Sequence, residues 1–190
     1  MISKREGFEL GKALAATALA FGIIIWREGN SLLFSVLTAA FTVGAGFILH
    51  ELAHRVVATR YGKHAEFKSN PQMLIIMMIM SLFLGIIVAA PGAVMISVPV
   101  SREESGKIAA AGPIANLALA VLFLFLLPFM TQVAYYGFMI NSLLGLFNMI
   151  PLPAFDGSKV LAWSRKAFVL ILMSAFALNI VNLVILKLLA

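Results

Sequence analysis

His50, Glu51 and His54 form a compact group of chemically active side chains in the run His50-Glu51-Leu52-Ala53-His54. On a helix, side chains four residues apart share a face, so both imidazoles can bind one Zn²⁺ ion. Glu51 lies one step round the same helix, where its carboxylate can accept a proton from water that the metal activates. The chain has no cysteine, so a metal bound here uses nitrogen and oxygen ligands. The motif therefore predicts a zinc site with a general base beside it.

Asp156 is the best-placed candidate for a third ligand, because a catalytic zinc takes three protein ligands and keeps one position open. It is the only aspartate in the chain, and no charged residue occurs between Lys107 and Asp156. Asp156 follows Pro151 and Pro153, which end a regular helix. Non-helical backbone is tolerated at membrane depth where it lines a cavity. Two interpretations of Asp156 stay open: a metal ligand, or an interfacial cap of the next helix.

Asn148 begins a second pattern, Asn148-x-x-Pro151-x-x-x-x-Asp156-Gly157. Its amide could stabilise developing negative charge, or it could cap a helix end. This pattern and the His-Glu-x-x-His motif together resemble the site-2 protease family of intramembrane zinc metalloproteases. The second motif of that family is N-x-x-P-x-x-x-x-D-G, and each fixed position matches here. The resemblance covers roughly residues 34–166.

The resemblance implies a set of roles for these residues. One zinc ion per chain would be bound by His50, His54 and Asp156, with Glu51 as the catalytic base. Asn148 would help to hold the substrate or stabilise the oxyanion.

Small and polar residues interrupt the apolar runs near these motifs. Gly112-Pro113-x-x-Asn116 resembles a further recurrent feature of the family, and we expect Asn116 to form a hydrogen bond between helices near the site. Gly44 and Gly46 precede the metal-binding motif, where they would let a neighbouring helix approach.

Long apolar runs decide the fold class. The chain of 190 residues is 62% apolar and 12% charged, whereas a soluble domain is about half apolar and a quarter charged. Runs of about 18 or more apolar residues are typical of membrane-spanning helices. We expect an all-α polytopic membrane protein with five to six transmembrane helices and a membrane-embedded re-entrant, β-prone segment around residues 69–101. The expected elements are spans over 10–26, 32–49, 108–127 and 167–186, a neutral turn near 131–136 before a return span that ends near 149, a helix over 73–90 and a β-prone run over 93–100.

The basic residues constrain the orientation of the chain. If residues 69–101 enter the bilayer and return, the basic loop after His54 and the run from Lys159 to Lys166 share one side, as the positive-inside rule favours. The same arrangement brings His50, His54 and Asp156 to one depth. We therefore expect a multi-pass protein of the cell membrane with its active site near the cytoplasmic side. The net charge of +6 forms no basic stripe with interleaved aromatics, so we expect no nucleic-acid partner.

Together with the resemblance, these features predict an intramembrane zinc metalloprotease, a hydrolase that cleaves transmembrane segments of other membrane proteins. We expect one transmembrane domain over residues 1–190, with a catalytic core over about 34–166 and no soluble domain. The implied partners are a transmembrane protein substrate and the lipid bilayer. A helical substrate must be unwound locally before cleavage, and the β-prone run over 93–100 offers an edge to which an extended substrate can add.

Two other classes of protein share some of these features. Another membrane metalloprotease with the same motif would use a third ligand other than aspartate, usually His or Glu. A non-catalytic metal-binding protein, transporter or scaffold is the second alternative. A transporter requires several intramembrane carboxylates or histidines along a path, whereas the sequence shows one cluster and retains Glu51.

Overall fold

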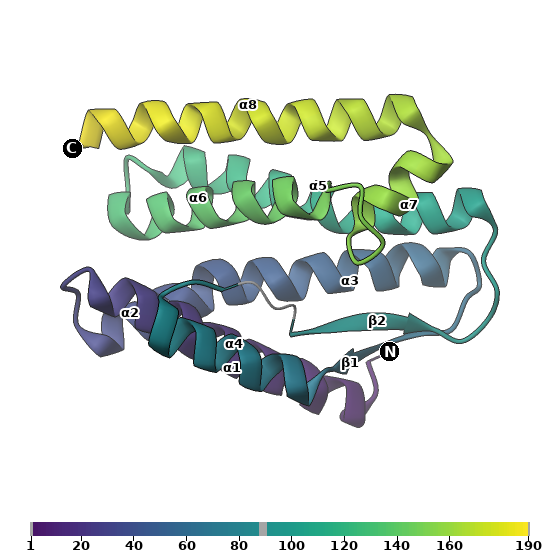
Figure 1. The fold of residues 1–190 in the computed structure, drawn as a ribbon, viewed down its shortest axis with the longest axis horizontal. Helices are drawn as coiled ribbons and strands as arrows, with labels where there is room; N and C mark the ends of the chain where they lie inside the picture. Colours follow the sequence, from purple (N-terminus) through teal and green to yellow (C-terminus); the bar gives the residue numbers. More distant parts are fainter. Residues whose placement is uncertain (1, 88–90, 190) are drawn as a thin grey trace.

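The computed structural model describes residues 2–87 and 91–189. Its elements are α1 (Lys4–Arg27), α2 (Leu32–Ala39), the π-helix η1 (Ala40–Gly44), α3 (Ala45–Arg60), β1 (Ala65–Ser69), α4 (Pro71–Leu84), β2 (Gly92–Ile96), α5 (Arg102–Leu126), α6 (Thr131–Asn148), α7 (Asp156–Trp163) and α8 (Arg165–Leu189) (Figure 1). The fold is that of an α-helical membrane protein with one small sheet.

Four helices in the described part of the chain are long and apolar enough to cross a membrane: Lys4–Arg27, Leu32–Arg60, Arg102–Leu126 and Arg165–Ile185. The sequence led us to expect five to six spans. Two helices explain why four are found instead of five or six. Neither α6, with 18 residues, nor α4, with 14, is among the four helices that are long and apolar enough to cross a membrane.

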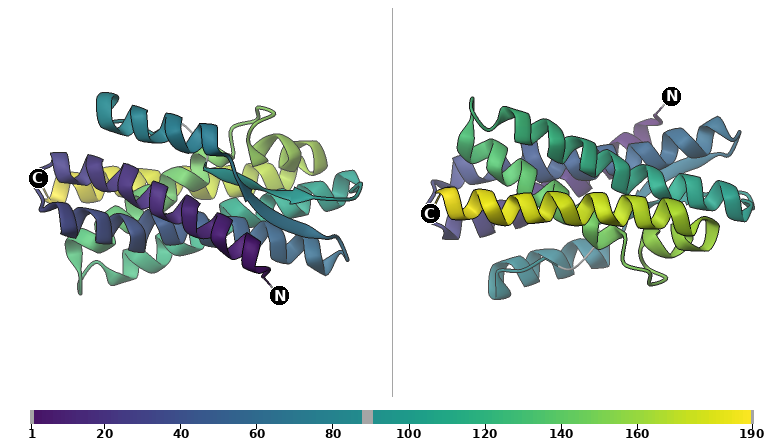
Figure 2. Two further views of the ribbon diagram at one scale, coloured as in Figure 1. Left: turned by 90° about the horizontal axis from the view of Figure 1, so that it is seen from below. Right: turned by 90° about the horizontal axis from the view of Figure 1, so that it is seen from above.

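The helix α3 lies in the middle of the molecule. On one side of it lie α1, α4 and the two strands, and on the other lie α5 and α6, with α8 outermost (Figures 1 and 2). Small residues allow the close packing of α5 on α6, where Ala120 and Ala134 are both fully buried. This layering places α3, which carries the His-Glu-x-x-His motif, between two walls of the protein.

The second span is one continuous helix from Leu32 to Arg60, with a π-helical turn at Ala40–Gly44. Ser31 caps its start by accepting a hydrogen bond from the amide of Phe34. The helix ends where Gly62 adopts a φ of 69°, a left-handed conformation that glycine adopts without strain. His50 and His54 therefore lie on regular helix near its C-terminal end.

A two-stranded antiparallel sheet lies beside α3. Phe67 of β1 is paired with Val94 of β2, and the register runs from Ala65 opposite Ile96 to Ser69 opposite Gly92. The β-prone run expected over 93–100 is strand only as far as Ile96. The partner strand β1 was not expected, because it falls in the basic loop, but it alternates buried Ala65 and Phe67 with more exposed neighbours.

The helix α4 belongs to a segment that leaves the sheet and returns to it. The backbone amide of Asn70 donates to the backbone carbonyl of Pro91 at 3.0 Å, so the two ends of the segment are adjacent. A helix of 14 residues is about 21 Å long, too short for a hydrocarbon core of about 30 Å. The helix expected over 73–90 ends at Leu84, where Gly85 adopts a φ of 67°. Residues 88–90 of that expectation lie outside the described residues.

The expected turn near 131–136 is wrong. Thr131 is the first residue of α6, and residues 127–130 form the connection after α5. Pro128 cannot donate a backbone hydrogen bond, which ends α5 early. The first turns of α6 are helical because Ala134 and Tyr136 are buried against neighbouring helices.

Candidate metal centre

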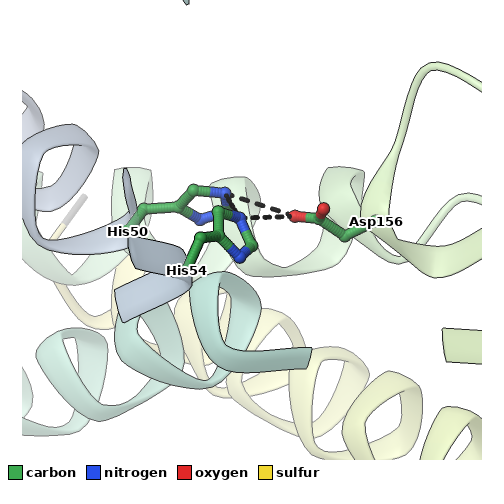
Figure 3. A group of neighbouring side chains, drawn as sticks. All are labelled: His50, His54 and Asp156. Carbon is green, nitrogen blue, oxygen red and sulfur yellow. Dashed lines mark hydrogen bonds and ion pairs between the residues drawn. The ribbon is translucent and has the colours of Figure 1, made fainter. Parts of the chain in front are cut away.

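Three side chains converge beside the middle of α3. His50 and His54 project from α3, and Asp156 is the first residue of α7 (Figure 3). Asp156 Oδ2 lies 3.3 Å from His50 Nε2 and 3.1 Å from His54 Nε2. All three residues are buried, and their ligand atoms lie within 4.8 Å of one another.

The segment between α6 and α7 brings Asp156 to the histidines. Pro151 and Pro153 keep this segment out of a helix, and α7 starts immediately afterwards. Gly157 packs against the end of α6 so closely that a Cβ atom there would lie 2.3 Å from the carbonyl oxygen of Met149. The Asp156 side chain does not cap the backbone of α7, so it is directed to the histidines instead.

The Nδ1 atom of each imidazole, which is the nitrogen farther from Asp156, forms a hydrogen bond with α5. His50 Nδ1 lies 2.6 Å from Asn116 Oδ1, and His54 Nδ1 lies 2.7 Å from the backbone carbonyl of Ile108. A carbonyl oxygen only accepts hydrogen bonds, so both Nδ1 atoms carry a proton. Both Nε2 atoms then present a lone pair, which is the arrangement that metal-binding histidines adopt.

The converging atoms fit a bound cation. His50 Nε2 and His54 Nε2 are 2.9 Å apart, and both face Asp156 Oδ2. An aspartate carboxyl group is ordinarily an anion at neutral pH. Three acceptors at these distances repel one another unless a positive charge lies among them. Two imidazoles and one carboxylate are a common ligand set for zinc.

Glu51 lies beside these ligands. It is 7% exposed, its carboxylate accepts a hydrogen bond from the backbone amide of Val94, and Oε2 has no hydrogen-bond partner among the described residues. A buried carboxylate oxygen without a partner is costly. Its position next to the metal ligands suits a group that exchanges a proton with a bound molecule.

A cavity of about 350 Å³ opens over the ligands. Its wall includes Glu51, the strand β2, Asn148 and Lys159. Asn148 is the last residue of α6. Its side-chain amide donates a hydrogen bond of 2.9 Å to the backbone carbonyl of Leu144. Because a primary amide has two N–H groups, the second can donate to a molecule in the cavity.

The helix α5 approaches the ligands through Gly112. A Cβ atom there would lie 2.5 Å from His50 Cε1 and 2.5 Å from His54 Nε2, so only glycine fits. The hydrogen bond expected for Asn116 is present, since its amide donates to the carbonyl of Gly46 on α3.

The sequence did not single out the carbonyl of Ile108 or the amide of Asn141. For Asn141 a signal existed, because an amide within an apolar helix is costly unless it is paired.

Comparison with known proteins identifies a relative. Over 169 residues, 85% of this chain, the sequence is 40% identical to a curated protein of Methanocaldococcus jannaschii that is named "Putative zinc metalloprotease MJ0611", of which the match covers 86%. No protein-family model and no solved structure matches the chain. Zinc is the cofactor that this relative and the His50, His54 and Asp156 group jointly support. The chain belongs to the same family of zinc metalloproteases as this archaeal protein.

Proposed function

We propose that the protein is an intramembrane zinc metalloprotease of the site-2 type, which cleaves transmembrane segments of other membrane proteins. The observation that carries this proposal is the position of Glu51, buried beside three convergent metal ligands within a bundle of apolar helices. A metal site that serves structure alone has no need of a buried, partly unsatisfied carboxylate at its edge.

His50, His54 and Asp156 would hold the metal, and zinc supplies Lewis-acid chemistry that polarises a carbonyl group and makes water more acidic. Glu51 accepts a proton from the attacking water and later delivers it to the leaving amine. Asn148, on the cavity wall, donates its second amide N–H to the substrate oxygen on which negative charge develops.

The outer edge of β2 can take up the substrate at Ile96, whose backbone amide points away from β1, although the outward amide of Val94 already donates to Glu51. The outer edge of β1 is covered by α1. Two outward backbone amides of β1, those of Phe67 and Ser69, donate to the carboxylates of Glu6 and Glu9 on α1. The other edge of the sheet belongs to β2, which lines the cavity. An extended segment of substrate that adds to β2 would therefore lie alongside Glu51.

The distribution of basic residues supports a cytoplasmic position for this end of the protein. The end of α3, the strand β1, the helix α7 and the start of α8 all lie at one end of the molecule (Figure 1). These segments contain six of the 14 Lys and Arg residues: Arg55, Arg60, Lys68, Lys159, Arg165 and Lys166. The opposite end carries Arg27 and Lys187. The positive-inside rule therefore favours an orientation with the metal centre near the cytoplasmic side of the cell membrane. In this orientation α4 is a re-entrant element.

The proposal is tested by cleavage of a single-span model substrate, with a helix-breaking residue in its transmembrane segment, in liposomes that contain the purified protein. Glu51→Gln is isosteric and keeps the metal ligands. It should reduce the cleavage rate by about 10²–10⁴-fold while the zinc content stays unchanged. Zinc binding without cleavage of any single-span substrate by the wild type would instead favour a non-catalytic metal-binding protein.

A further inference from the structure

Asn141 lies in the middle of α6 and is fully buried. Its Nδ2 donates to the carbonyl oxygens of Gly137 at 2.9 Å and Thr42 at 3.3 Å. Because backbone carbonyls only accept hydrogen bonds, these two contacts fix the amide of Asn141 with its nitrogen toward them. Its Oδ1 must face the other way, toward α5.

That oxygen meets the side chain of Asn116. Asn116 Nδ2 donates to Asn141 Oδ1 at 3.1 Å and to the carbonyl of Gly46 at 3.2 Å. Both groups that face this nitrogen are acceptors, so the amide of Asn116 also has one orientation. Its Oδ1 is then the atom that lies 2.6 Å from Nδ1 of His50.

The orientation of Asn116 selects the form of His50. An oxygen opposite Nδ1 requires a proton on that nitrogen, which leaves the lone pair on Nε2, the atom that faces Asp156. A flipped Asn116 would present an N–H group to Nδ1 and favour the opposite tautomer, in which Nε2 carries a proton and cannot bind a metal.

We infer that Asn141 is a positioning residue for the metal centre, which fixes the orientation of Asn116 and, through it, the metal-binding tautomer of His50. The series of contacts begins at η1, whose Thr42 carbonyl accepts from Asn141. Gly46 makes room for it, because a Cβ atom there would lie 2.1 Å from Asn141 Oδ1. The inference rests on the zinc site of the proposed function and needs no statement about proteolysis.

A double-mutant cycle on the full-length protein in detergent tests this inference. Zinc affinity is measured by competition with a chromophoric chelator for the wild type, Asn141→Leu, Asn116→Leu and the double variant. Partners of metal ligands typically contribute 10–100-fold in metal affinity. We expect Asn141→Leu to weaken zinc binding about 10-fold and the double variant to bind zinc as Asn116→Leu does, because Asn141 acts through Asn116.

Ser142→Ala is the matched control. Ser142 is also fully buried on α6, but its hydroxyl contacts Met139 and Asn179 rather than α5. The absorption spectrum of bound Co²⁺ should change in Asn141→Leu and stay as in the wild type in Ser142→Ala, even if both variants unfold at lower temperature. If Asn141→Leu does not fold, Asn141→Ser, which is smaller and cannot reach Asn116, replaces it in every measurement.

Wild-type zinc affinity in the Asn141 variants, or additive losses in the double variant, would overturn the inference and leave the proposed function standing. Absence of zinc binding by the wild type would overturn both.

Discussion

Gly112 lies in direct contact with the imidazole of His50, since a Cβ atom at position 112 would lie 2.5 Å from His50 Cε1. The backbone of α5 thus forms the floor of the metal centre. The same helix supplies the backbone carbonyl of Ile108 to His54, about one turn before Gly112, and the side-chain oxygen of Asn116 to His50, about one turn after it. Two helices therefore define the positions of both imidazoles.

Gly112→Ala should abolish or strongly weaken zinc binding, because the added methyl group would displace one or both imidazoles. We expect a loss of at least about 10-fold in zinc affinity, as for other disruptions next to metal ligands. Gly11→Ala is the control, since a Cβ atom at position 11 would have no atom within 4 Å. Equal zinc affinity in the two variants would show that α5 does not lie against the ligands.

Ile96→Pro tests the open edge of β2. Phe67 and Ser69 direct their backbone amides away from β2, and Ala65 belongs to the same alternating set of β1 residues. Ile96 is paired with Ala65, so the backbone amide of Ile96 points away from β1. Proline at Ile96 therefore removes an outward donor without breaking the ladder. Cleavage should slow by roughly 10-fold, the value of one hydrogen bond of about 1.4 kcal/mol, with zinc retained. Ile96→Ala keeps the amide and should be near wild type. Identical cleavage rates in both variants would exclude substrate addition at this edge.

Asn148→Ala should lower the cleavage rate by about 10²–10³-fold, the usual cost of removing a donor to an oxyanion. Zinc content should not change, because Asn148 lines the cavity and its side-chain amide donates to the carbonyl of Leu144 rather than to a metal ligand. Stability measured by chemical denaturation serves as the control. A cleavage rate close to the wild type would assign Asn148 to capping α6 alone.

Glu6→Ala should lower the free energy of unfolding by about 3 kcal/mol, because it removes one partner of a buried ion pair. Glu6 is 1% exposed and lies 2.8 Å from Arg55 Nε, and it also accepts from the amide of Phe67. Glu103→Ala, which breaks the exposed pair with Lys107, should change this free energy by no more than about 0.5 kcal/mol. Urea unfolding in detergent compares the two, and equal effects would show that Glu6 does not tie α1 to α3 and β1.

The parts of the site that the sequence predicted are those fixed by local rules. The spacing of His50 and His54 places them on one helix face whatever surrounds that helix. Asp156 could be selected because it is the only aspartate and follows two prolines in an apolar region.

The parts that were missed depend on contacts between distant segments. The strand β1 forms because Phe67 packs against Leu10 and Ala13 of α1, which the composition of a basic loop does not indicate. Val98, within the expected β-prone run, lies beyond β2 because the pairing with β1 ends at Ile96. Asn141 acquires its role from carbonyl groups on η1 and from Asn116 on α5, none of which its neighbours in the sequence reveal.

The central claim is that His50, His54 and Asp156 bind one zinc ion. It is tested most directly by the zinc content of the protein, purified in detergent without chelators, for the wild type and Asp156→Ala. We expect about one zinc ion per chain in the wild type and a sharp reduction in the variant, since a catalytic zinc uses three protein ligands. Full retention of zinc in Asp156→Ala would require a different third ligand, and absence of zinc from the wild type would contradict the account.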